Sequence, residues 1–145
     1  MKILIIGMSL LIAMGFNACE QEKVSAKVKS AFSQKYPDAK NIDWDMEEDG
    51  EWEAGFDMNG DEMSASFDQN GKWLETETEM DEDKLPDAVD STLTSNFESF
   101  DVEDVEYLES PEGKGYEIQL EGDENDLEVL IGENGGTLRR ETTEE

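Results

Sequence analysis

The sequence predicts an α+β fold of two tandem units, each with one helix packed on a four-stranded antiparallel β-meander. Two stretches carry an apolar residue at every fourth position, which is typical of one face of an amphipathic helix. Short segments of alternating apolar and polar residues follow each stretch, as in strands that bury one face. The second half of the chain repeats this order, so that Trp52 corresponds to Tyr116 and Asn70-Gly71 to Asn134-Gly135.

The two predicted helices occupy residues 24–36 and 85–97. The apolar stripe of the first helix consists of Val24, Val28, Phe32 and Tyr36. The stripe of the second has the same spacing and consists of Leu85, Val89, Leu93 and Phe97. Pro37 ends the first helix, whereas Pro86 suits the first turn of the second because its missing N–H is not needed there. Each stripe is expected to pack against the strands that follow it.

Four strands are expected after each helix. Their alternating segments are 42–46, 52–58, 63–67 and 73 onward in the first unit, and 105–107, 116–120, 127–131 and 138 onward in the second. Asn-Gly pairs between these segments predict tight hairpins, because both residues tolerate positive φ. The aromatic residues of the strands are expected to pack beneath the helices, and the pattern leaves open whether Trp73 or Leu74 points inward. The units therefore span residues 24–80 and 81–145, the second including an acidic linker and tail.

The amino terminus indicates export. Residues 1–18 combine an early lysine with an apolar run that is short for a transmembrane helix, which is typical of a signal peptide. The stretch Phe16-Asn17-Ala18-Cys19 resembles the lipobox of bacterial lipoproteins, with Phe16 where leucine is usual. This predicts lipid attachment at Cys19 and a tether over residues 19–23. An ordinary signal peptide with an incidental cysteine is the alternative; a retained membrane anchor is disfavoured, because acidic residues begin at Glu20.

Composition excludes several functional classes. The chain has 39 acidic and 11 basic residues and a formal net charge of −28, which argues against nucleic acid as a partner. It has no histidine and one cysteine, which excludes Ser-His-Asp and Cys-His catalysis, His/Cys zinc sites and internal disulfides. Carboxylate pairs are so numerous that their presence alone does not indicate a glycosidase. No catalytic residue, enzymatic activity or cofactor is predicted.

One segment resembles the start of a calcium-binding loop. Residues 57–62 contain the spacing D-x-N-x-D. An EF-hand requires Gly at its sixth position and Glu at its twelfth, where this chain has Glu62 and Asp68. The flanking alternation favours a hairpin turn, so no metal site is predicted, and a weak Ca²⁺ site is the alternative.

Two runs of residues resemble a known family. AFSQKYPDAKNIDWD at residues 31–45 and SASFDQNGKWLETETEM at residues 64–80 are similar to the PepSY-like family of exported bacterial proteins. The resemblance covers most of residues 24–140 and is weaker in the second unit, where Phe97-Glu98 replaces Tyr-Pro. It implies a fold like that of the beta-lactamase inhibitory protein, with two helix-plus-sheet units. It also implies a lipoprotein or secreted protein of Bacteroidetes-type bacteria, and with Cys19 an outer-membrane lipoprotein of the cell envelope. The biochemical role of the family is largely unassigned.

The polar side of the strands is predicted to form an acidic face. If Trp52 and Tyr116 point toward the helices, then their polar neighbours lie on the opposite side of the sheet, open to solvent. The candidate partner-binding residues on this face are Glu51, Glu53, Asp57, Glu117, Glu121 and Glu128. Such a face could dock a basic protein or peptide, or it could serve only to solvate the protein.

These observations lead to two functional hypotheses. The leading one is a non-enzymatic, lipid-anchored binding protein of the cell envelope that resembles a protease inhibitor or regulatory module and binds basic partners through the acidic face. The alternative is an acidic envelope protein that binds or buffers Ca²⁺ and has no specific protein target. The expected contact with the membrane is through the N-terminal lipid anchor.

Overall fold

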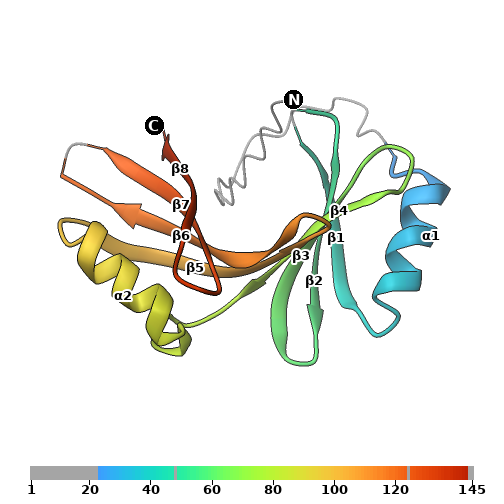
Figure 1. The fold of residues 1–145 in the computed structure, drawn as a ribbon. Helices are drawn as coiled ribbons and strands as arrows, with labels where there is room; N and C mark the ends of the chain where they lie inside the picture. The colour runs from blue at the N-terminus through green and yellow to red at the C-terminus, as the bar shows by residue number, and fades with distance from the viewer. Residues whose placement is uncertain (1–22, 48, 124, 144–145) are drawn as a thin grey trace.

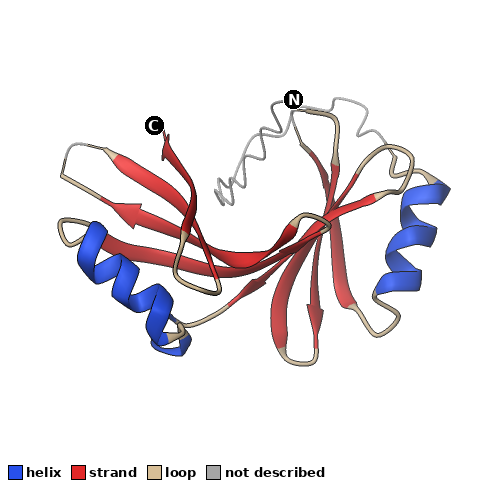
Figure 2. Ribbon diagram, in the orientation of Figure 1, coloured by secondary structure: helices blue, strands red, loops and turns tan. Residues whose placement is uncertain are grey.

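The computed structural model describes residues 23–47, 49–123 and 125–143. All of its strands belong to one antiparallel sheet, in which each strand pairs with the next along the chain (Figures 1 and 2). The elements in the first half are α1 (Ala26–Lys35), β1 (Lys40–Met46), β2 (Trp52–Met58), β3 (Asp61–Phe67) and β4 (Trp73–Glu79). Those in the second half are η1 (Glu82–Lys84), α2 (Asp87–Asn96), β5 (Asp101–Ser110), β6 (Gly113–Glu121), β7 (Asp126–Gly132) and β8 (Thr137–Thr143).

The prediction of two tandem units with separate four-stranded meanders is wrong, because the sheet is a single one of eight strands. Strands β4 and β5 pair over four residues, from Thr76 opposite Glu109 to Glu79 opposite Glu106. The chain leaves β4, passes through η1 and α2, and returns along β4 as β5 (Figure 1). This pairing satisfies backbone groups that two separate sheets would leave at their edges.

Helix α1 packs on the first half of the sheet. Ser25 caps its start by accepting a hydrogen bond from the Val28 N–H at 3.3 Å. Three residues of the predicted stripe, Val28, Phe32 and Tyr36, are buried against β2 and β3, and Val24 is partly buried beside them. The strands contribute Trp52, Ala54, Phe56, Ala65 and Phe67 to this core. The Tyr36 hydroxyl is hydrogen-bonded to Thr76 on β4, which ties the end of the helix to the sheet. Trp73 also packs against this core, so it is Trp73 and not Leu74 that points toward the helix.

Helix α2 packs on the second half in the same way. Its core consists of Val89, Leu93, Phe97, Val105, Tyr116, Ile118, Leu120, Leu127, Val129 and Ile131. The turn between β7 and β8 lies directly on the helix, where Thr92 donates a hydrogen bond to the Gly135 carbonyl at 2.6 Å. Gly135 has φ +82°, and a Cβ at this position would lie 2.5 Å from the Ala88 carbonyl oxygen. Glycine is therefore required for this approach of turn and helix.

Both helices cover the same face of the sheet. One row of direct cross-strand partners runs through Phe56, Met63, Thr78, Tyr107, Tyr116 and Ile131, and it includes members of both cores. Directly opposite residues share a face, so the two helices lie on one side of the sheet. The sheet is curved and the helices lie outside the curve (Figure 1). We call the opposite side the helix-free face.

Candidate functional site: a glutamate cluster on the helix-free face

Glutamates from five strands gather on the helix-free face. We define the glutamate cluster as Glu53 of β2, Glu75 and Glu77 of β4, Glu106 of β5, Glu117 of β6 and Glu128 of β7. Glu75, Glu77, Glu117 and Glu128 are only 3–6% exposed. Glutamate is almost never fully buried unless it is paired, so this degree of burial requires an explanation.

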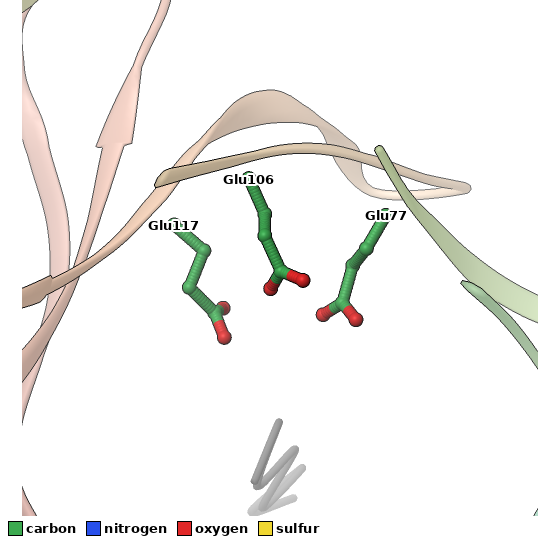
Figure 3. A group of neighbouring side chains, drawn as sticks. All are labelled: Glu77, Glu106 and Glu117. Atoms are coloured by element: carbon green, nitrogen blue, oxygen red, sulfur yellow. The ribbon is translucent and has the colours of Figure 1, made fainter. Parts of the chain in front are cut away.

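The register of the strands brings these side chains together. Glu106 lies opposite Glu79 on one side and Glu117 on the other. Glu77 is diagonal to Glu106 across the same ladder, because it lies opposite Leu108. Figure 3 shows the carboxylates of Glu77, Glu106 and Glu117 side by side, and one oxygen from each lies within 4.8 Å of the other two.

Arg139 of β8 supplies a positive charge at one end of the cluster. Its Nη2 donates to Glu117 Oε2 at 2.5 Å and to Glu128 Oε1 at 2.8 Å. At the other end, the Ser64 hydroxyl donates to Glu77 Oε2 at 3.0 Å. Among the described residues, the buried side-chain atoms without a hydrogen-bond partner are Glu75 Oε2, Glu77 Oε1 and Arg139 Nε. The carboxylates thus outnumber the groups that neutralise or hydrogen-bond them.

Burial and mutual repulsion weaken the acidity of the cluster. Burial, with the charge of Glu77 second, raises the pKa of Glu53 from the ordinary 4.5 to about 7 and that of Glu75 to about 8. Burial is also the main cause of the raised pKa values of Glu106 and Glu117, and neighbouring carboxylates add to it. Arg139 opposes the rise at Glu117 without cancelling it. The site therefore favours the uptake of protons or of cations.

A comparison with known families identifies the relatives of this chain. The family described as "Putative beta-lactamase-inhibitor-like, PepSY-like" matches residues 51–139, which is more than half of the chain. The chain belongs to this PepSY-like family. The resemblance predicted from residues 31–80 is thereby confirmed.

Solved structures share the fold of this PepSY-like chain. A BLIP-like protein from Bacteroides fragilis is 28% identical, with a TM-score of 0.74 over 83% of this chain and 87% of that one. A protein from Bacteroides eggerthii described as "putative periplasmic" is 25% identical, with a TM-score of 0.73 over 83% and 89% of the two chains. No curated protein matches this chain. In the described part of the PepSY-like chain, neither helix is long and apolar enough to cross a membrane.

The predicted site residues of the PepSY-like chain fall into two groups. Glu53, Glu117 and Glu128 belong to the glutamate cluster, and Asp57 lies on the same face near the β1 edge, where it accepts a 2.5 Å hydrogen bond from Asn41. The other two predicted residues lie outside the cluster: Glu51 precedes β2, and the exposed Glu121 ends β6 near Glu103 and Asp101. The expectation of a solvent-open acidic face is wrong at the centre of the sheet, because strand register crowds these carboxylates into buried positions.

Four residues of this site were missed by the sequence analysis: Glu75, Glu77, Glu106 and Arg139. The segment LETETE at residues 74–79 carries a usable signal, because its strict alternation puts the glutamates on one face of the strand and the threonines on the other. In the structure, Thr76 is buried on the helix side. The glutamates of the segment must then point to the helix-free face. The position of Glu106 beside Glu77 depends on the pairing of β4 with β5, which the pattern of either strand does not reveal.

The segment with calcium-loop spacing is a hairpin turn, as favoured by the sequence. Asn59 and Gly60 have φ values of +59° and +101° and connect β2 to β3, with Met58 opposite Asp61. Across the described residues, the carboxylates spaced for a metal ion are those of Glu77, Glu106 and Glu117 and not those of this turn. The predicted signal peptide and Cys19 lie outside the described residues.

Proposed function

We propose that this chain is a non-enzymatic binding module of the cell envelope that binds a basic segment of a partner protein on its helix-free face. The observation that carries the proposal is the glutamate cluster, in which buried carboxylates exceed the positive charge of Arg139. A lysine or arginine side chain placed against the half-buried Glu53 would supply positive charge that Arg139 alone does not.

The charge around the cluster favours the approach of such a partner. Further acidic residues lie toward the rim of the helix-free face: Asp43, Asp45, Asp57, Glu62, Glu79 and Asp104. Together with the net charge of −28, they create a negative potential that speeds the encounter with a basic surface. Because exposed charges are screened by salt, this attraction must weaken as ionic strength rises.

The envelope location and the absence of catalysis are part of the proposal. A similar protein from Bacteroides eggerthii is described as "putative periplasmic", and the family is described as "Putative beta-lactamase-inhibitor-like". The chain lacks histidine, which removes the commonest general base near neutral pH. Lipid attachment at Cys19 belongs to the same proposal, and labelling of cells with a radioactive fatty acid tests it by comparing wild type with Cys19→Ser.

A labelled oligo-arginine peptide tests the partner-binding proposal directly. Fluorescence anisotropy is measured with the full chain, the Glu53→Gln/Glu75→Gln variant and the Asp87→Asn/Asp90→Asn variant. The last variant removes the same number of charges from α2, on the opposite side of the sheet. We expect wild type and the α2 variant to bind equally and the cluster variant to bind at least tenfold more weakly. Equal binding by the two variants would refute a specific role for the cluster.

A further inference from the structure

We propose that Glu77, Glu106 and Glu117 form a calcium-binding site. They lie on the three adjacent strands β4, β5 and β6, and one carboxylate oxygen from each lies within 4.8 Å of the others. Their side chains extend from the sheet in the same direction and end side by side (Figure 3). The paired strands fix their spacing, so the site needs no loop to fold around the ion.

An unpartnered oxygen supports this assignment independently of the clustering. Glu77 is only 5% exposed, and its side chain points into the group in Figure 3. Oε2 accepts a hydrogen bond from Ser64, whereas Oε1 is buried with no partner among the described residues. A buried carboxylate oxygen without a partner is costly, and a bound cation would supply the missing interaction.

The geometry favours Ca²⁺ among the common cations. All the offered ligands are carboxylate oxygens, which suit hard cations. Ca²⁺ binds oxygen at about 2.3–2.6 Å, so two ligands on opposite sides of the ion lie up to about 5 Å apart. Mg²⁺ binds at about 2.0–2.1 Å and requires a tighter set of ligands than this spread of up to 4.8 Å. Glu106 is only partly buried, which leaves room for water to complete the coordination.

The residues around the site carry more negative than positive charge. Arg139 binds Glu117 through Oε2, so this ion pair does not use the second oxygen of Glu117. The charges of Asp104 and Glu79 act on Glu106, and that of Glu128 acts on Glu117. A divalent cation would reduce the repulsion among these carboxylates, including that between the directly opposed Glu106 and Glu117.

Calorimetric titration of the full chain with CaCl₂, without any peptide, tests the site. We expect one ion per chain, with at least tenfold weaker binding in Glu77→Gln and in Glu106→Gln. Glu121→Gln is the matched control, because Glu121 lies on the same strand as Glu117 but is exposed. A second control is Asp61→Asn in the β2–β3 turn. Both controls should bind within twofold of wild type.

Thermal unfolding separates loss of the site from loss of the fold. Without calcium, Glu77→Gln should melt at or above the wild-type temperature, because it removes one charge from a crowded group. With calcium, wild type and Glu121→Gln should gain stability, and Glu77→Gln should gain little. Absence of binding by wild type at millimolar calcium would overturn the proposal, as would unchanged binding by Glu77→Gln or loss of binding in Asp61→Asn. This inference does not depend on the partner-binding proposal, whose test uses Glu53 and Glu75.

Discussion

Glu106 on β5 lies directly opposite Glu117 on β6, and both side chains extend to the helix-free face. Like charges in this position destabilise a sheet by a few tenths of a kcal/mol each, and burial adds to the cost of keeping both charged. The pair is nevertheless built into the centre of the sheet, next to Glu77. The stability of the fold should therefore depend on the groups that neutralise these carboxylates: protons, Arg139 or a bound cation.

Stability should rise as pH falls from about 8 to about 5. The pKa of Glu75 is raised from 4.5 to about 8 in the folded chain, so the folded state binds more protons than the unfolded one across this range. The stabilising contribution is fully present below pH 4.5 and is lost as pH rises through about 8. Urea unfolding at several pH values, without divalent cations, measures how the free energy of unfolding changes with pH.

A double variant of the cluster is the control for this pH dependence, because the pKa values depend on the charged groups around it. Arg139 opposes the raised pKa values, and Glu128, Asp104 and Glu79 reinforce them. Replacing Glu106 and Glu117 with Gln removes two of the titrating groups and should flatten the dependence. A slope that is unchanged in this double variant would show that general surface repulsion, and not the cluster, controls the response to pH.

Removal of Arg139 should destabilise the protein, and more so at high pH. Arg139→Gln leaves Glu117 and Glu128 buried without their shared partner, which costs about 3 kcal/mol when both are charged. The loss should shrink near pH 5, because protonated carboxyls need no counter-charge. Arg140→Gln is the neighbouring control: Arg140 lies over the Phe97 ring on the helix side. Equal losses from the two variants would argue against the ion pairs.

Gly135→Ala should cost more than Gly60→Ala. Both glycines have positive φ, so each substitution introduces backbone strain of about 1 kcal/mol or more. Only at Gly135 would the new Cβ also collide with the Ala88 carbonyl, forcing the β7–β8 turn away from α2. We expect a total loss of about 2–4 kcal/mol for Gly135→Ala, measured by urea unfolding. Equal effects at the two positions would contradict close packing of turn and helix.

The continuous sheet should make the whole chain unfold in one transition. Phe32 lies on the buried face of α1 and contacts the rings of Tyr36, Trp44, Phe56 and Phe67. Phe32→Ala should cost about 3–5 kcal/mol. Because β4 and β5 are paired, the second half should be destabilised as well.

Two spectroscopic signals test this coupling. All three tryptophans lie in the first half of the chain, so their fluorescence reports on that half, whereas far-ultraviolet circular dichroism reports on the whole sheet. The two signals should shift together in Phe32→Ala. A circular dichroism curve with a second, unshifted step would show that the halves unfold independently.

Local pattern was sufficient to predict the helix faces and the turns. Val28 and Phe32 on α1, and Val89 and Leu93 on α2, are buried as their fourfold spacing requires. The Asn59-Gly60 turn has the positive φ values that its residues favour. These features depend on residues close in sequence, whose geometry follows from backbone preferences alone.

The single sheet and the glutamate cluster depend on contacts between distant residues. Alternation fixes which face a side chain occupies, but it does not identify the neighbouring strand or the register. The pairing of β4 with β5 could therefore not be derived from either segment, and neither could the proximity of Glu77 to Glu106 or the contact of Arg139 with Glu117. For the same reason, Glu117 and Glu128 were predicted on the correct face but not in a buried position.

The four-pair ladder between β4 and β5 is the shortest junction in the described sheet. Glu77 stands on one side of that junction, and Glu106 and Glu117 stand on the other. Any ligand held by all three would link the α1 half of the molecule to the α2 half where the fewest backbone bonds join them. Occupancy of this position would then stiffen the relative orientation of the halves and preserve the curvature of the surface offered to a partner.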